Sequence, residues 1–309
     1  MRLAFSLLLL AACTHSPTTA PPTVREVEVA VTVDDLPLHG PLLPGQTRLD
    51  LARGMLAVLA RHHLPPVVGF VNGVRVEAFP DTRAVLETWR AAGQPLGNHG
   101  WSHRNLDQTE LEPYLADITA NEPLLEQLEP DAAARHFYRY PFLHEGADAA
   151  RRRAVRDFLR QHGYRTAEVS LDGDGWAFSE PRVRCAAKGD QATLHRLHEQ
   201  FVEVHVDELR RMRALGLQLE HRELRHVLLL HLGVAEVDAL DGLLTAYEHE
   251  GVRWVSLGRA LDDPFYAIDP DQGFRGGAAF PYLVAKARGV EARPIYLRGL
   301  EEQLEQVCR

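Results

Sequence analysis

Hydrophobic and polar residues alternate over residues 26–33, and this period of two predicts a β-strand that ends in two aspartates. Short apolar runs predict further strands at 67–71, 95–98, 137–141, 166–171, 227–231 and 252–257. Apolar residues at helical spacing predict helices at 48–61, 82–92, 111–128 (interrupted near Pro123), 147–162, 191–215 and 238–249. Because strands and helices alternate along the chain, we expect a parallel sheet with right-handed crossovers, closed into a barrel rather than left open.

Polar residues capable of catalysis stand at or just after the ends of the predicted strands. They are Asp34, Asp35, His99, His103, Arg139, Asp172, Asp174 and His231. In a parallel α/β barrel, the carboxyl ends of the strands converge on one rim, where active sites lie. The sequence therefore predicts that these side chains form one site.

The aspartate pair and two histidines can supply an Asp/His/His metal site with a second carboxylate beside it. One carboxylate then binds the ion and its neighbour takes a proton from bound water, which is the minimum for metal-assisted hydrolysis. If the strand is regular, Asp34 and Asp35 point to opposite faces and have different tasks. His99 and His103 share a face if their segment is a helical turn. Simpler interpretations are a solvated Asp-Asp turn and a chance pair among 16 histidines.

The first residues have the pattern of an export signal. A short basic start and an apolar stretch precede Leu-Ala-Ala-Cys, which matches a bacterial lipobox and predicts a lipoprotein signal peptide at 1–12 with lipidation of Cys13. An ordinary secretory signal with a chance cysteine is the simpler alternative. The Pro/Thr/Ser-rich residues 13–24 predict a disordered tether, and residues 25–309 a single catalytic domain. We therefore expect a protein of the bacterial cell envelope, on the periplasmic face or outer membrane, that contacts the membrane only through Cys13.

Composition narrows the partners further. The formal net charge is −9 and Lys188 and Lys286 are the only lysines, which argues against nucleic acid as a partner. Beyond Cys13 the chain has two cysteines, Cys185 and Cys308. The sequence leaves open whether they pair or are two unrelated buried thiols.

Four segments carry a resemblance to a known enzyme family. They are 32–35 (Thr-Val-Asp-Asp), 98–103 (Asn-His-Gly-Trp-Ser-His), 139–142 (Arg-Tyr-Pro-Phe) and His231 after an apolar strand. In this order they resemble the motifs of the NodB-homology polysaccharide deacetylases, carbohydrate esterase family 4, over about residues 27–257. The resemblance implies a distorted (β/α) barrel of about seven parallel strands and a divalent metal ion, usually Zn²⁺.

The resemblance also implies roles for individual residues. Asp34 would be the general base, and Asp35, His99 and His103 the metal ligands. Arg139 would orient the base.

On the other side of the substrate, the backbone N–H of Phe142 would help bind the oxyanion. His231 would be the general acid with Trp176 packed beside it, and Leu228 and Leu230 would wall the acetyl-methyl pocket.

The chain departs from the family in two places. The fourth motif, usually Asp-x-x-Asp-Trp, is Asp-Gly-Asp-Gly-Trp at 172–176, so that Gly175 replaces an acid. Either Asp174 serves instead through a shifted turn, or the support for Arg139 is weaker. The helical insertion at about 180–225 is larger than the family needs, and is either a packing embellishment or a cover over the substrate.

The function expected from these motifs is metal-dependent removal of acetyl groups from an N-acetylated glycan, such as peptidoglycan, a chitin-like polymer or an exported polysaccharide. One alternative is hydrolysis of another non-peptide C–N bond on the same barrel. Another is a non-catalytic glycan-binding envelope lipoprotein, for which we expect eroded motifs.

Overall fold

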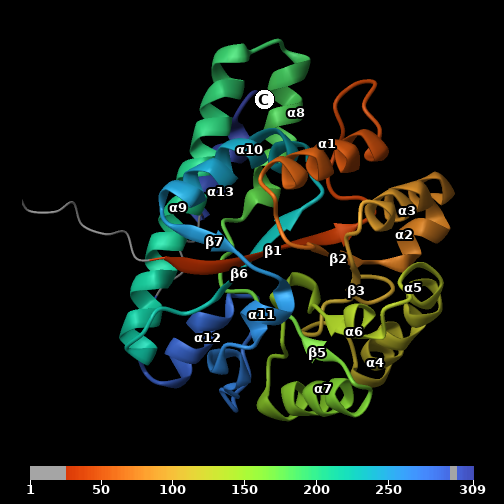
Figure 1. Ribbon diagram of the computed structural model, residues 1–309, viewed down its shortest axis with the longest axis vertical. Coiled ribbons are helices and arrows are strands. Elements are labelled where there is room, and N and C mark those ends of the chain that lie inside the picture. Colours follow the sequence, from red (N-terminus) through yellow and green to blue (C-terminus); the bar gives the residue numbers. More distant parts are fainter. Residues whose placement is uncertain (1–25, 293–297) are drawn as a thin grey trace, which may run out of the picture.

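Figure 1 shows a computed structural model of the protein, in which residues 26–292 and 298–309 are described. The signal peptide predicted at 1–12, the tether at 13–24 and the anchor at Cys13 lie outside the described residues. No helix in the described ranges is both long and apolar enough to cross a membrane.

Seven parallel strands form a curled sheet in the middle of the molecule (Figure 1). They are β1 (Val27–Leu36), β2 (Val68–Val71), β3 (Leu96–Asn98), β4 (Phe137–Tyr138), β5 (Arg165–Thr166), β6 (His226–His231) and β7 (Val252–Trp254). Their order is β5-β4-β3-β2-β1-β6, with β7 paired to β1. A bridge between Leu171 and Leu228 brings the chain after β5 beside β6, so that the sheet curls back on itself. The predicted distorted barrel is confirmed.

The strand β1 is the centre of the core. It is buried along nearly its whole length, which suits its four valines, and it pairs with β2, β6 and β7. Its register with β6 places Asp34 directly beside His231. Two residues that are 197 positions apart in the sequence therefore share one end of the sheet.

Helices cover the outside of the sheet. They are α1 (Arg48–Arg61), α2 (Gly73–Ala78), α3 (Arg83–Ala91), α4 (Leu111–Ala120), α5 (Glu122–Leu128), α6 (Ala132–Arg135), α7 (Ala149–Gln161), α8 (Ser179–Ala187), α9 (Gln191–Glu220), α10 (Val234–His249), α11 (Leu257–Leu261), α12 (Phe280–Ala287) and α13 (Arg298–Gln306). The single helix predicted at 111–128 is two helices, with Pro123 in the first turn of α5. The sequence did not predict α2, α6, α8, α11, α12 and α13.

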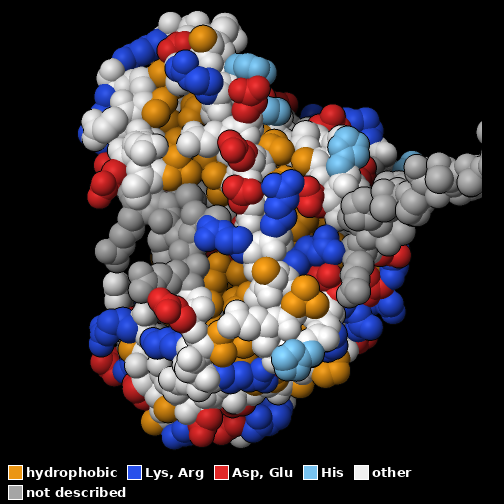
Figure 2. Space-filling model, turned by 90° about the vertical axis from the view of Figure 1, so that its left-hand side faces the viewer, with side chains coloured by type: hydrophobic (Ala, Val, Ile, Leu, Met, Phe, Trp, Pro, Cys, Tyr) orange, Lys and Arg blue, Asp and Glu red, His pale blue; other side chains and the backbone are white. Residues whose placement is uncertain are grey.

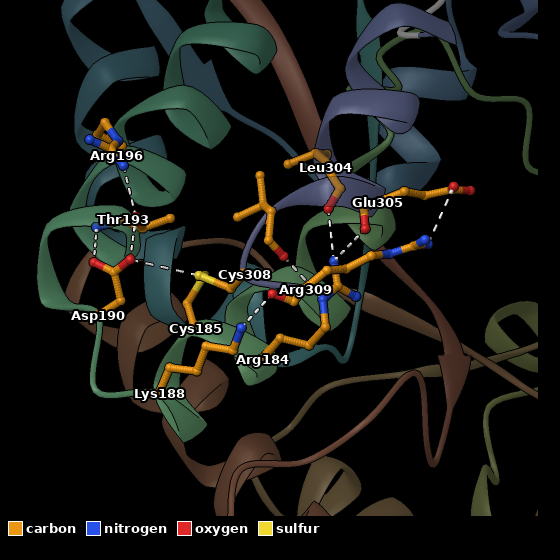
Figure 3. Close-up of a disulfide and its surroundings, with 11 residues drawn as sticks. Arg184, Cys185, Lys188, Asp190, Thr193, Arg196, Leu304, Glu305, Cys308 and Arg309 are labelled. Carbon is orange, nitrogen blue, oxygen red and sulfur yellow. Dashed lines mark hydrogen bonds and ion pairs between the residues drawn. A yellow bond between two sulfur atoms is a disulfide. The ribbon is translucent and has the colours of Figure 1, made fainter.

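The helical segment at 180–225 consists mainly of α9, which packs against α8, α10 and α12. A disulfide joins Cys185 in α8 to Cys308 just beyond α13, which settles the pairing that the sequence left open (Figure 3). Acidic and basic side chains are interspersed on the face that Figure 2 shows, with apolar patches between them.

Candidate active site

A cavity of about 440 Å³ opens at the carboxyl ends of the strands. It is lined by most of the residues that the sequence singled out, namely Asp34, Asp35, His99, His103, Phe142, Asp174, Trp176 and His231. Arg139 is fully buried behind Asp34. The prediction that the strand-end residues form one site is confirmed in geometry, whatever chemistry they perform.

The two aspartates face the same cavity, contrary to the expectation of opposite faces. Asp35 has a left-handed backbone (φ 62°), and the register between β1 and β2 shifts between Val33 and Leu36. The strand is therefore irregular where the aspartates lie, and strict alternation of its side chains fails there. Such a conformation is uncommon for a residue other than glycine and concentrates at functional sites.

The two histidines lie on a loop after β3, and not on the helical turn that their spacing predicted. His99 donates its Nδ1 proton to the backbone carbonyl of Arg139 (2.9 Å), which leaves the lone pair of Nε2 facing the aspartates. Asn72 supports the loop by donating to the carbonyl of His99 (2.8 Å). His103 has a left-handed backbone (φ 54°) and brings its Nε2 to 3.2 Å from Asp35 Oδ1.

These three side chains fit a divalent cation. Asp35 Oδ1 is buried and has no hydrogen-bond partner among the described residues, and it lies 3.6 Å from His99 Nε2. One ligand atom from each of Asp35, His99 and His103 lies within 4.8 Å of the others. A carboxylate oxygen and the lone pair of a neutral imidazole repel each other unless a proton or a cation lies between them. Burial lowers the pKa of both histidines to about 4, which keeps them neutral and suited to bind metal.

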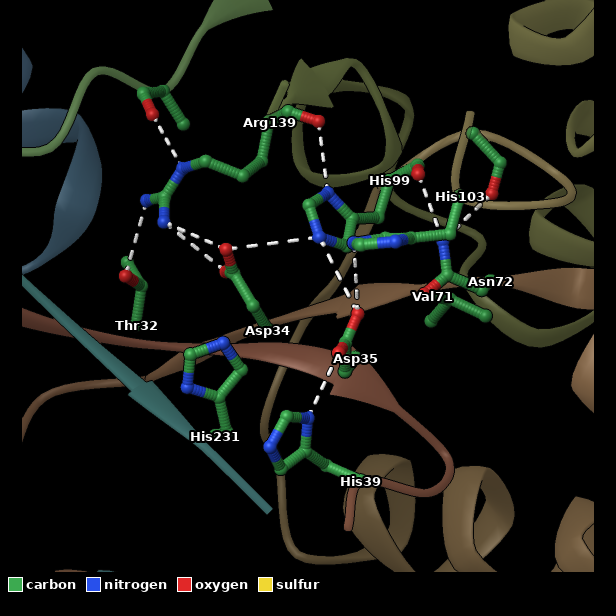
Figure 4. A network of polar contacts seen from close by, with 12 residues as sticks. Thr32, Asp34, Asp35, His39, Val71, Asn72, His99, His103, Arg139 and His231 are labelled. Carbon is green, nitrogen blue, oxygen red and sulfur yellow. Dashed lines mark hydrogen bonds and ion pairs between the residues drawn. The ribbon is translucent and has the colours of Figure 1, made fainter. Parts of the chain in front are cut away.

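Arg139 fixes the other aspartate. Its Nη1 donates to both oxygens of Asp34 (3.1 Å each), while Nη2 donates to the hydroxyl of Thr32 (3.1 Å). Its Nε donates to the carbonyl of Ala167 (2.6 Å). Burial raises the pKa of Asp34, although Arg139 acts to lower it. Arg139 thus holds Asp34 in place at the cavity (Figure 4), and burial increases the proton affinity of Asp34.

Asp174 does not replace the missing family acid as a support for Arg139, whose contacts in the described chain go to other residues. Instead it accepts a hydrogen bond from Trp176 Nε1 (3.3 Å), and burial, with the charge of Asp172, raises its pKa to about 7. Packing explains why residue 175 is a glycine, because a Cβ there would lie 2.9 Å from the ring of Phe201. The long helix α9 thus occupies the space that a side chain at 175 would need.

His231 lies on the opposite side of Asp34 from Arg139 (Figure 4). Its Nδ1 is 3.6 Å from Glu236 Oε1, and its ring centroid is 4.4 Å from that of His39. Burial alone would lower the pKa of His231, but Glu236 and the aspartates outweigh it and raise the pKa to about 9. The ring that lies against His231 is therefore that of His39; Trp176, predicted beside it, lines the same cavity.

The predicted apolar wall is displaced by one residue. Leu229 lines the cavity on the same face of β6 as His231, whereas the predicted Leu228 and Leu230 alternate with it and point to the other face. The prediction of Leu228 and Leu230 was wrong because His231 faces the cavity. Side chains of a strand alternate between its two faces, so Leu229, two residues before His231, faces the cavity as well.

Sequence reasoning missed several polar residues of the site, among them His39, Glu236 and Glu208. His39 donates to Asp35 Oδ2 (2.8 Å) and holds the pKa of Asp35 well below its usual range, against the effect of burial. Glu236 lies behind His231, and Glu208 of α9 lines the cavity. His39 follows Asp35 by four residues and Glu236 follows His231 by five, so nearness in the chain was the available signal.

A family model described as polysaccharide deacetylase matches residues 22–167, the segment that contains β1 to β5. This segment is similar to the polysaccharide deacetylase family, and the resemblance predicted from its motifs is confirmed. A search of curated protein sequences finds no match.

Solved structures of this family share the fold. The polysaccharide deacetylase Bc1974 from Bacillus cereus is 17% identical over 75% of this chain and 92% of its own, with a TM-score of 0.52. The Bc1960 peptidoglycan N-acetylglucosamine deacetylase is 21% identical over 77% and 89%, with a TM-score of 0.50. BA3943 from Bacillus anthracis, a CE4 family pseudoenzyme, is 14% identical over 77% and 66%, with a TM-score of 0.53. Because this fold serves enzymes and a pseudoenzyme, activity must be argued from the residues of the chain itself.

Proposed function

We propose that the protein is a metal-dependent hydrolase that removes acetyl groups from an N-acetylated glycan. The observation that carries this proposal is the position of Asp34, between the guanidinium of Arg139 and the ring of His231. Beside it lies an Asp/His/His set suited to a cation. A general base, a general acid and a metal site on one cavity are what hydrolysis of an amide with a poor amine leaving group requires.

Asp35, His99 and His103 would hold the ion, with zinc proposed from the nitrogen and oxygen donors. When bound there, the ion would polarise the acetyl carbonyl and lower the pKa of a water molecule. The hydrogen bond from His99 to the carbonyl of Arg139 supports this assignment, because it orients the imidazole ligand in the way that metal sites commonly require.

The proton movements follow from the flanking groups. An oxygen of Asp34 accepts a proton from the water that attacks the acetyl carbon, and the raised pKa of Asp34 suits a base. His231, kept protonated by Glu236, donates a proton to the nitrogen as the C–N bond breaks, so that acetate and a free amine leave. The N–H of Phe142 would contribute to oxyanion binding, because Phe142 lines the cavity with its ring 4.4 Å from that of His103.

The location of this activity rests on the N-terminal sequence. The lipobox pattern before Cys13 supports a lipid-anchored protein of the bacterial envelope, where N-acetylated glycans are abundant substrates. Labelling with a radioactive or clickable fatty acid, with a Cys13→Ala variant as control, tests the anchor independently of the enzyme.

Acetate release from N-acetylglucosamine oligomers tests the activity, with protein that is metal-stripped and then reloaded with zinc. We expect release that requires zinc, and a loss of about 10²–10⁴-fold in kcat for Asp34→Asn. Because the ion would be held by the other three residues, zinc binding should persist in this variant. Zinc binding without acetate release from any glycan would favour another C–N bond or a non-catalytic role. Failure to bind zinc would refute the proposed ligands.

A further inference from the structure

A second cavity of about 400 Å³ adjoins the first. The two share His39, Trp176 and Glu301 as lining residues, so they form one continuous cleft. Trp176 stands at the junction with 43% of its surface exposed, which is unusual for so large an apolar side chain. Each volume lies within the range of about 300–1,000 Å³ that is typical of ligand pockets, and the first cavity contains all the proposed catalytic groups.

Two walls of the second cavity come from α8 and α13, which lie outside the segment matched by the family model, and the rest of its lining comes from residues 39–41, Trp176 and Ala177. Arg184 of α8 donates from Nη2 to the carbonyl of Leu304 (2.8 Å) and from Nε to that of Val307 (3.1 Å) (Figure 3). The disulfide between Cys185 and Cys308 closes the same contact. Leu304 is 2% exposed, so its side chain packs α13 against the hydrophobic core. The C-terminal helix is thus a fixed wall of the cleft.

The groups that this wall presents suit a sugar ring. Glu180 of α8 and Glu305 of α13 line the cavity with side chains that are 75% and 66% exposed. Their ion pairs to Arg184 (3.5 Å) and Arg309 (3.6 Å) are long and solvated, and therefore weak. Carboxylates accept strong hydrogen bonds from hydroxyl groups, while an exposed indole offers a flat apolar face to the C–H side of a pyranose.

We propose that the second cavity is a subsite for a further sugar of the same glycan chain, beyond the two that the first cavity would hold, with Trp176, Glu180 and Glu305 as its recognition residues. The substrate is then an oligomer or polymer, and the C-terminal helix sets its preferred length. This inference rests on the proposed function, because it takes a sugar in the first cavity to be the one that is deacetylated.

The test compares the dimer and the pentamer of N-acetylglucosamine on the full chain loaded with zinc. Calorimetry in an Asp34→Asn background, where turnover is abolished or slow, measures binding separately from catalysis. The variant is Glu180→Ala/Glu305→Ala, and the matched control is Glu302→Ala, an exposed glutamate on the same helix that lies outside the lining of the cavity. Acetate release by the corresponding variants in the wild-type background gives kcat/KM for both lengths.

In the chain with an intact cleft, we expect the pentamer to bind more tightly than the dimer. The double variant should weaken binding of the pentamer by about tenfold, roughly the effect of one charge-assisted hydrogen bond, and leave the dimer unchanged. The Glu302→Ala control should change neither. Equal affinity for the two lengths, failure of the pentamer to bind, or equal losses for both would overturn the subsite. Tight, length-dependent binding without acetate release would keep the subsite and refute the proposed catalysis.

Discussion

At the scale of single residues, the two carboxylates at the end of β1 have opposite electrostatic surroundings. Asp34 is buried against one guanidinium and its pKa is raised, whereas Asp35 accepts a hydrogen bond from His39 and its pKa is well below the usual range. Adjacent residues of the same type can therefore serve as a base and as a permanently charged ligand. Burial acts on both, and the partner groups decide the difference.

The contact of Glu236 with His231 predicts the pH dependence of activity. Because Glu236 helps to raise the pKa of His231 to about 9, the protonated acid persists up to about that pH and activity should fall only as the pH rises through it. In Glu236→Gln the pKa of His231 should move down, so the basic limb of kcat/KM should shift to lower pH. Ser179→Ala, which removes only the hydroxyl that donates to Glu236 Oε2 (3.3 Å), is the control and should leave the limb in place. An unchanged profile in Glu236→Gln would contradict this role.

The lowered pKa values of the proposed metal ligands predict how zinc affinity depends on pH. Zinc needs neutral imidazole, and a histidine of ordinary pKa, about 6.5, loses that form as the pH falls below it. In the metal-free protein the pKa of His99 and His103 is lowered to about 4, so the neutral form survives to lower pH. Zinc affinity, measured by competition with a chelator, should therefore change little between about pH 7.5 and about pH 5.5. A steady loss of affinity that begins near pH 6.5 would show that the rings are not desolvated.

At the scale of elements, the sequence predicted the strands and helices that carry a clear period, and failed where tertiary packing decides. The helix at 48–61 was predicted at its observed bounds because its apolar residues have helical spacing, and the structure shows a capping box at Thr47 and Asp50 that fixes its start. The bulge at Asp35 could not be read from residues that are typical of a regular strand. The site residues were predicted from motifs, whereas Glu208 joined them through a helix whose docking no local pattern reveals.

The fourth motif shows how one element constrains another. Gly175 has Phe201 and His205 of α9 against its Cα, at 2.9 and 3.3 Å from where a Cβ would stand. Restoring an acid there with Gly175→Asp should therefore destabilise the fold by about 1–3 kcal/mol, the usual cost of overpacking. Urea unfolding measures the loss, and Phe201→Ala in the same chain should recover part of the cost of the aspartate by opening space. If Gly175→Asp is as stable as the wild type, α9 is not the reason for the glycine.

At the scale of the whole molecule, the chain closes on itself through one covalent link. The disulfide joins residues 123 positions apart, and the loop that it closes contains α9, β6, α10 and β7. Cys185 and Cys308 join the two helices, α8 and α13, that form one wall of the proposed active-site cleft. The disulfide therefore links the stability of this half of the chain to the shape of the cleft.

The variant Cys308→Ser separates stability from substrate recognition. A cross-link over so long a loop restricts the unfolded chain, and its loss should lower the free energy of unfolding by about 2–5 kcal/mol. Because α13 would then lose its covalent link to α8 and be held by noncovalent contacts such as those of Leu304 and Arg184, KM for the N-acetylglucosamine pentamer should rise. The dimer, which needs only the first cavity, should be hydrolysed as before. Chemical denaturation and kinetics at a temperature well below unfolding measure the two effects. Equal changes in KM for dimer and pentamer would mean that the disulfide supports the whole site and not the C-terminal wall alone.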